Sequence, residues 1–422
     1  MPNTTRCFVD YLFGKAAAIT DAVRAKAEAC RQDYLAVTAA GAANNKAHWT
    51  KMMDRFPDGN AEIIGFGRKC DSKTAALING FNAHALELDD GQRFAMIHLG
   101  ASVISAIKAA SDDGGVSGEG FLTGIIMGYE AACRIAIAMQ PSHKNRGYHT
   151  AGTCGTIGSA VGAAFALGMD KTQMERVLAC AAGSAAGMLE IQEQGSEIKP
   201  YNVGRAAMDG LAAAYMGFTY FGTPDDMLGG ERGFFRLFAD QCDIGKLTEN
   251  TDYFEIERIY IKPYASCRHS HSAVEAAIKL RENCRIDDIA AITVRTYKLG
   301  VKGHDHTEIL GIASAKLSTP YAVAAGLLYG RADLSAFEPL DEDVISLARK
   351  VTVTEDPALT AECPQKRIAI VTVRMSDGTE HSVRVDHAKG EPENPMTEKE
   401  LEEKQRFLRL FSEEQEKTWP VC

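Results

Sequence analysis

The sequence predicts a mainly α protein, in which an all-helical domain carries an inserted α+β domain. Apolar residues recur at helical spacing through residues 1–255, whereas residues 256–394 alternate strand-like and helical segments. The charged segment 395–422 again reads as helix and resembles the first part in type. Since 422 residues exceed one ordinary core, we expect a helical domain of 1–255 with 395–422 and an inserted domain of 256–394.

The helical part shows both periodicity and capping signals. Val23, Ala27, Cys30, Tyr34 and Val37 are spaced by four and three, which is the stripe of an amphipathic helix. Alanine and glycine are dense from about 151 to 217, which is typical of closely packed helices. Further expected helix starts are a capping box at Thr172 and Glu175, an N-cap in Thr223–Asp226, and Thr397 with Glu400 before the last helix.

The α+β part contains alternating candidates for strands and helices. The expected strands are 256–264 and 288–297, and a hairpin is expected over 367–386, turning at Ser376-Asp377-Gly378. The expected helices are 272–280 and 318–330.

Composition excludes several classes of function. A net charge of −10 without a basic run disfavours nucleic acid, and no apolar run approaches the ~18 residues of a membrane span. Eleven cysteines without a C-x-x-C pair indicate reduced thiols in a cytoplasmic protein and disfavour an iron–sulfur cluster. The first residues lack the layout of a signal peptide.

The segment from Gly195 to Gly210 is the most informative stretch for function. Lys199 precedes a loop that opens a helix of small and apolar residues, Ala206 to Met216. Lys199, Arg205 and the free N–H groups of a buried helix start would together favour a bound anion. The alternative is that Lys199 is an ordinary surface lysine.

Three other segments carry groups suited to proton transfer. In His84–Gly100 paired carboxylates could do acid/base work or orient a histidine, although His84 itself reads as a core histidine. In Arg146–Ala160 His149 lies beside glycines 152, 155 and 158, which form either an anion-binding turn or close helix contacts. Lys262–Ala273 offers Cys267, Arg268, His269 and His271.

A metal is not expected, although two H-x-H pairs are present. His269 with His271, and His304 with His306, lack the third and fourth ligands at zinc-site spacing, and H-E-x-x-H is absent. Walker A and G-x-S-x-G are absent as well. A zinc hydrolase and a non-catalytic binding protein stay open as remote alternatives.

Six motifs in consistent order resemble the MmgE/PrpD family, from about residue 60 to the C-terminus. They are H-A-L-E-L-D-D, G-Y-H-T-A-G-T-C-G-T-I-G-S-A, I-K-P-Y-N-V-G-R-A-A-M-D-G, T-P-D-D-M-L-G-G-E-R-G-F, K-P-Y-A-S-C-R-H-S-H and G-E-P-E-N-P-M-T. The family includes 2-methylcitrate dehydratases, cis-aconitate decarboxylases and iminodisuccinate epimerases. The resemblance implies a cofactor-free homodimer with an α+β lid inserted in its helical domain.

The resemblance also implies site residues. His98, His149 and Lys199 fall where decarboxylase-type members have histidine, histidine and lysine. Glu87 replaces an aspartate, Gly91 a threonine, and Cys267 a histidine that His269 adjoins. These differences disfavour plain cis-aconitate decarboxylation and leave the shared proton chemistry intact.

The predicted function is therefore that of a metal-independent lyase, which moves a proton next to a carboxylate of a small di- or tricarboxylate. A hydro-lyase of the 2-methylcitrate type ranks first, a two-base epimerase using Cys267 second, and a cis-aconitate-type decarboxylase is a further alternative. The expected catalytic residues are His98, His149, Lys199, Cys267 and His269. The expected substrate-binding residues are Glu87, Asp90, Arg93, Arg268 and His271.

Overall fold

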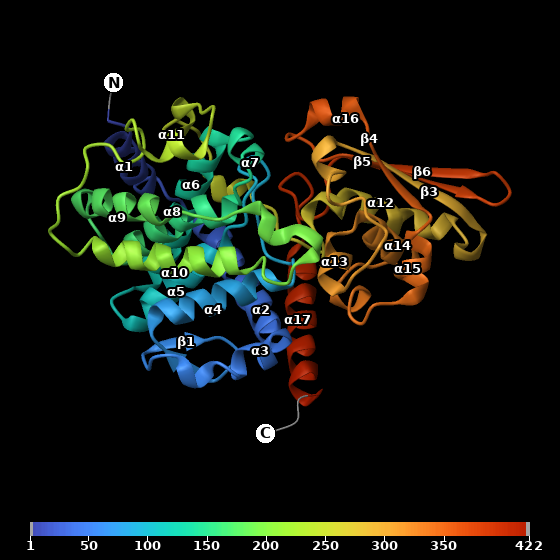
Figure 1. Cartoon of the computed structure of the whole chain (residues 1–422), viewed down its shortest axis with the longest axis horizontal. Coiled ribbons are helices and arrows are strands. Elements are labelled where there is room, and N and C mark those ends of the chain that lie inside the picture. Colours follow the sequence, from blue (N-terminus) through green and yellow to red (C-terminus); the bar gives the residue numbers. More distant parts are fainter. Residues whose placement is uncertain (1–2, 419–422) are drawn as a thin grey trace.

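The computed structural model describes residues 3–418 and is mainly α, as predicted. Figure 1 shows the helices of the first half packed together on one side and a small sheet with its helices on the other. The larger helices of the first half are α1 (Thr4–Ala16), α2 (Asp21–Asn44), α4 (Ser72–Ala85), α5 (Gly100–Asp113), α6 (Gly118–Met139), α8 (Thr150–Ala166), α9 (Lys171–Ser184) and α10 (Tyr201–Met216).

Close contact between α6, α8 and α10 explains the many small residues of this region. A Cβ on Gly152 would lie 2.7 Å from the carbonyl oxygen of Ala186, and one on Gly158 would lie 2.7 Å from the Cβ of Ala132. Both glycines are inside α8, as is Gly155. The glycines therefore allow close helix packing, which was one of the two expected alternatives. The other alternative, an anion-binding turn, is wrong.

Three local expectations for the helical part need correction. Strands β1 (Ala61–Ile63) and β2 (Arg68–Cys70) form an antiparallel pair, so this part is not purely helical. The capping box of α9 is formed by Asp170 and Gln173, two residues earlier than expected. Asp226 starts no helix of its own and instead accepts from the backbone N–H groups of Thr4 and Thr5 at the start of α1.

The sheet of the C-terminal half has the order β4–β3–β5–β6. The predicted strand at β3 (Ile289–Thr296) and the hairpin of β5 (Ala369–Met375) and β6 (Glu380–Val385) are confirmed. Strand β4 (Val351–Glu355), which pairs parallel to β3, was not predicted. Helices α12 (His271–Leu280) and α14 (Thr319–Tyr329) pack on the sheet.

The segment 256–264 is not a strand, contrary to the prediction. A short 3-10 turn, η4 (Glu255–Arg258), is followed by a single bridge between Tyr260 and Gly91. This bridge joins the start of the C-terminal half to the loop after α4. The chain therefore brings the His84–Gly100 segment beside the Lys262–Ala273 segment.

The last helix, α17 (Glu398–Thr418), lies against α2 (Figure 1). Thr397 caps it, since the Thr397 hydroxyl accepts from the backbone N–H of Glu400, and Nζ of Lys404 lies 2.6 Å from Oδ1 of Asp33 on α2. Elsewhere, α6 is long and apolar enough for a membrane span by length and composition, unlike the expectation from the sequence. Its most apolar window is 78% buried, which is the situation of a core helix.

Candidate active site

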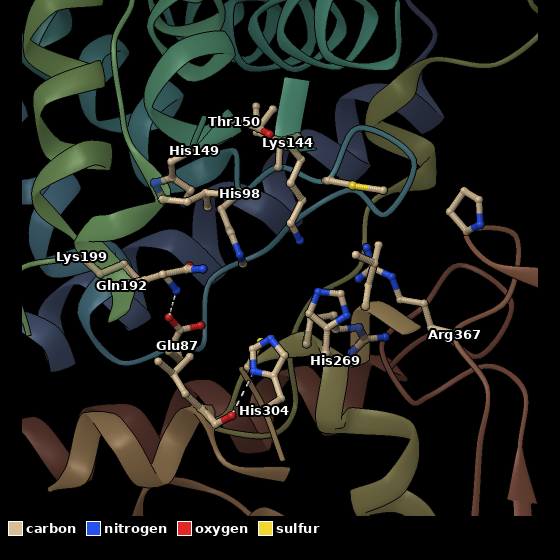
Figure 2. A pocket seen from close by; sticks show the side chains of 18 of the residues that line it. Glu87, His98, Lys144, His149, Thr150, Gln192, Lys199, His269, His304 and Arg367 are labelled. Carbon is tan, nitrogen blue, oxygen red and sulfur yellow. Dashed lines mark hydrogen bonds and ion pairs between the residues drawn. The ribbon is translucent and has the colours of Figure 1, made fainter. Parts of the chain in front are cut away.

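A cavity of about 90 Å³ lies where the loops of the helical part meet those of the C-terminal half (Figure 2). It gathers residues from all four segments singled out in the sequence. Its lining includes Glu87, His98, Lys144, Tyr148, His149, Thr150, Gln192, Lys199, Cys267, Arg268, His269, His304, Cys363 and Arg367.

Glu87 is held between two lysines at one side of the cavity. Nζ of Lys199 donates to Oε1 of Glu87, and Nζ of Lys262 lies 3.0 Å from its Oε2. All three side chains are buried, and Glu87 has a left-handed backbone with φ of 55°. Burial opposes ionisation of Glu87, but the two lysines more than offset it and hold the pKa of Glu87 well below its usual range. Lys199 is therefore a buried cation of the cavity and not a surface lysine.

His98 and His149 line the cavity near this ion pair (Figure 2). Nδ1 of His98 lies 3.0 Å from the carbonyl oxygen of Asp90, to which it donates, so a neutral His98 has its lone pair on Nε2. Nδ2 of Asn202 donates to Nδ1 of His149 at 3.1 Å, so a neutral His149 carries its proton on Nε2. A neutral His98 can therefore accept a proton at Nε2, and a neutral His149 can donate a hydrogen bond from its Nε2–H.

Burial lowers the pKa of both histidines. For His98 the carboxylate of Asp89, 3.3 Å from Nδ1, opposes burial without cancelling it. For His149 burial and the charge of Lys199 act together, so its pKa falls well below the usual value. Both rings are therefore neutral at neutral pH.

Cys267 and His304 form a pair in the part of the cavity contributed by the C-terminal half. Sγ of Cys267 lies 3.8 Å from Nε2 of His304, whose Nδ1 donates to the carbonyl oxygen of Leu317 at 3.0 Å. Burial opposes ionisation of the thiol, but His304 more than offsets it and lowers the pKa of Cys267 to about 6. Conversely, Cys267 raises the pKa of His304 against the effect of burial. The pair thus favours a thiolate beside an imidazolium.

His269 lies beside this pair and is oriented by Tyr297. Nδ1 of His269 is 2.7 Å from the Tyr297 hydroxyl, and the His269 and His304 rings are 5.1 Å apart. Burial, together with the charges of Lys144 and Arg367, lowers the pKa of His269 well below the usual value. His269 therefore lines the cavity as a neutral ring.

Two cations of the cavity, Lys144 and Arg367, were missed in the sequence. Nη2 of Arg367 donates to the carbonyl oxygen of Arg93, and its Nε has no hydrogen-bond partner among the described residues. Burial and the charge of Arg367 lower the pKa of Lys144. Lys144 directly precedes the His149 motif and Arg367 begins the predicted hairpin, but neither position carries a pattern that separates it from a surface cation.

Protein partners already bind four of the side chains predicted to bind substrate, so their substrate-binding roles stay predictions. These four are Arg93, Arg268, His271 and Asp90. Arg93 pairs with Glu391 at 2.8 Å, outside the cavity lining. Arg268 lines the cavity, but its guanidinium pairs with Glu391 at 2.8 Å and donates to Nδ1 of His271 at 2.9 Å, which leaves His271 buried behind it. Asp90 accepts from Tyr129 at 2.5 Å.

Arg205 was also considered as an anion-binding group, but protein groups already bind its guanidinium. Its guanidinium pairs with Asp209 and donates to the carbonyl oxygens of Gly152 and Ala186. It is not among the residues that line the cavity. Arg205 therefore ties the start of α10 to α8 and to the loop after α9.

A cluster of His84, Asp89 and His98 has the arrangement of a possible metal site. Its ligand atoms lie within 4.8 Å of one another, and Nδ1 of His84 is 2.7 Å from Oδ2 of Asp89. Lys262 lies 3.5 Å from Oδ1 of Asp89 and already supplies a positive charge there. His84 is buried, as predicted, but its Nε2 has no hydrogen-bond partner among the described residues. In the second H-x-H pair, Nε2 of His306 donates to the carbonyl oxygen of Ser314 at 3.1 Å, and Nε2 of His304 faces Cys267.

These features define a class of protein: a mainly α protein with a buried cavity that is lined by histidines and cationic side chains. Matches to two family models identify this class more narrowly. The MmgE/PrpD N-terminal domain matches residues 10–246 and the MmgE/PrpD C-terminal domain matches residues 264–419. The chain belongs to the MmgE/PrpD family.

Curated relatives of this chain are named as decarboxylases. The cis-aconitate decarboxylase-like protein oryM of Aspergillus oryzae is 27% identical over 85% of this chain and 80% of its own length. The cis-aconitate decarboxylase of Aspergillus terreus is 26% identical over 84% and 78%. The human cis-aconitate decarboxylase is 22% identical over 96% and 88%. Family and relatives together support a lyase-type function.

Proposed function

We propose that this chain is a metal-independent lyase, which transfers a proton at the carbon next to a carboxylate of a small di- or tricarboxylate. The observation that carries the proposal is the pairing of neutral His98 and His149 with the Cys267–His304 pair in one cationic cavity. The C-terminal half, which supplies Cys267 and His304, then acts as the lid over a substrate bound on the helical half.

The cavity matches the charge that develops when such a proton leaves. Removal of the proton produces an enediolate, which carries more negative charge than the bound carboxylate. Lys199, Lys144 and Arg367 face this charge in a buried site, where fixed cations and N–H donors are most effective. Nε2 of His98 accepts the proton, and the N–H of His149 donates to an enediolate oxygen.

Dehydration of a 2-methylcitrate-like hydroxy acid is the first branch that we propose. The imidazolium of His304 protonates the departing hydroxyl while His98 removes the proton, so that water leaves and a double bond forms. Decarboxylation, the activity named for the relatives, is a second branch. In this second branch carbon dioxide leaves the substrate first, and the imidazolium of His304 then gives a proton to the carbanion.

Epimerisation is favoured by one specific observation, the thiolate–imidazolium pair. Cys267 and His98 come from different halves of the chain and line the same cavity. An epimerase needs one group to remove a proton and a second group to return it from the opposite face. In this branch Cys267 and His98 fill these two roles, and the substrate is an iminodisuccinate-like diacid.

A panel of di- and tricarboxylates incubated with the protein in D₂O tests these branches. NMR reports deuterium incorporation and unsaturated products, and a coupled assay reports carbon dioxide. Loss of water without carbon dioxide supports the hydro-lyase. Carbon dioxide release identifies the decarboxylase, and exchange with inversion identifies the epimerase. Absence of both exchange and turnover across the panel contradicts the proposed function.

A further inference from the structure

A second, larger cavity adjoins the candidate active site. It has a volume of about 390 Å³, against about 90 Å³ for the first. The two cavities share Glu87, Lys199 and Leu317 in their linings. These three residues therefore form the boundary between a cationic chamber and a second space.

The second cavity is largely apolar at its sides. Trp49, Met52, Phe81, Ile198 and Ile312 line it together with Leu317. The Trp49 and Phe81 rings make an edge-to-face contact with centroids 5.3 Å apart, and the Trp49 N–H is already satisfied by Asn82.

The described part of the chain leaves the mouth of this cavity uncovered. Ile198 is 56% exposed and Met52 is 45% exposed, so apolar surface is left open to water beside the boundary. The nearby cation Lys316 is neutralised by Glu338 at 2.6 Å and offers no free charge. The apolar side chains of the lining are therefore suited to an apolar group, while Asn44, Asn45 and His48 form a polar part of it.

We propose that this apolar cavity binds a hydrocarbon arm of the carboxylate substrate. The inference rests on the proposed function and narrows its substrate class to alkyl-substituted di- or tricarboxylates with an arm longer than methyl. A carboxylate paired with Lys199 lies on the boundary, so an alkyl group on its neighbouring carbon passes Leu317 into the apolar space. A simple entry channel for a small, strongly hydrated acid would not need exposed Met52 and Ile198 beside Lys199.

Isothermal titration with a series of 2-alkylsuccinates, from methyl to hexyl, tests the proposal on the full chain. Each buried methylene is worth about 0.8 kcal/mol, so each should tighten binding about fourfold until the cavity is filled. Ala313→Phe, which fills the cavity from α13 (Ile312–Leu317), should leave methylsuccinate binding unchanged and abolish the gain for longer arms. Ala18→Phe, at an exposed position after α1, is the matched control and should behave as the parent.

If Ala313→Phe does not fold, Met52→Gln at a half-exposed position replaces it, and it should weaken only the long-arm ligands by several-fold. Equal or falling affinity from methyl to hexyl in the parent protein would overturn the proposal. Equal loss for all arm lengths in the variants would overturn it as well. If succinate and every alkylsuccinate fail to bind, and the panel in D₂O also shows no turnover, the proposed function fails and the apolar subsite fails with it.

Discussion

Sγ of Cys267 lies 3.8 Å from Nε2 of His304, in the same cavity as His98, His149 and Lys199. The two residues are 37 positions apart in the chain. His304 donates from Nδ1 to a backbone carbonyl, which leaves Nε2 for the thiol. Because the pKa of Cys267 is lowered and that of His304 is raised, this contact favours a thiolate beside an imidazolium in the cavity.

The Cys267–His304 contact should be visible in the reactivity of the thiol. Since the pKa of Cys267 is lowered to about 6, labelling by iodoacetamide should rise through pH 6 in the parent protein. In His304→Asn burial is no longer offset by the imidazolium, so the midpoint should rise to about 8.5 or above, which lowers the thiolate fraction at pH 7 at least roughly 30-fold. Peptide mass spectrometry measures the rate, and the exposed Cys7 and Cys242 serve as internal controls. Unchanged labelling of Cys267 in the variant would contradict the pairing.

Lys199→Ala should lower kcat by about 10²-fold or more, which is the scale for loss of one charge-stabilising donor. Glu87 keeps its contact with Lys262 at 3.0 Å, so the fold should survive. Steady-state kinetics on the substrate found in the panel measure the effect. Lys69→Ala, at an exposed position on β2, is the control and should be neutral. Turnover within threefold of the parent would remove Lys199 from the mechanism.

His98 should titrate below its usual value, and Asp89 should limit that shift. Burial lowers the pKa of His98 while the Asp89 carboxylate favours the charged ring. Asp89→Asn removes the favourable charge, so the pKa of His98 should fall further. Histidine NMR against pH, with the His98 signal assigned through His98→Gln, measures it. Asp377→Asn in the exposed β5–β6 turn should leave the titration unchanged, and an upward shift in Asp89→Asn would refute the assignment.

Activity should survive removal of metals. The cluster of His84, Asp89 and His98 already holds the positive charge of Lys262 3.5 Å from Asp89, which disfavours a bound cation. Prolonged dialysis against EDTA should therefore leave turnover unchanged, with metal content well below one ion per chain by elemental analysis. One zinc or iron per chain in active protein, lost together with activity in His84→Gln, would revive the metal alternative.

Arg93→Met should destabilise the protein without changing substrate affinity. The Arg93–Glu391 pair is buried and measures 2.8 Å, and Glu391 keeps its second partner, Arg268, when Arg93 is removed. The loss is therefore that of buried hydrogen bonds left unmade, at a cost of about 1–3 kcal/mol. Thermal melting and KM, measured side by side, separate this role from the substrate-binding role predicted from the sequence. Arg331→Met breaks an exposed pair and should change neither quantity. A raised KM at unchanged stability would restore Arg93 as a substrate ligand.

Local spacing was sufficient to predict much of the helical part. Val23, Ala27, Cys30, Tyr34 and Val37 are all buried on α2, as their spacing predicts. The reason is physical: a helix brings residues three and four positions apart onto one face, whatever the rest of the chain does. The β5–β6 hairpin was predictable for the same reason, since its pairing is set by a short turn.

The motifs of the sequence also sufficed to select five of the residues that meet in the cavity. His98, His149, Lys199, Cys267 and His269 all line it, although 171 positions separate the first from the last. Their catalytic roles stay predictions, because proximity shows which groups can act together and not which reaction they perform.

Only the tertiary structure decided which charged groups are free to meet a substrate. Arg93 and Arg268 look like substrate ligands in the sequence, but both pair with Glu391, which lies almost 300 and over 120 positions away. Arg367 looks unremarkable in the sequence, and His304 was considered only as half of an H-x-H metal pair, yet both line the cavity. Helical periodicity depends on near neighbours along the chain, whereas the partner of a buried charge depends on which distant segment the fold brings beside it.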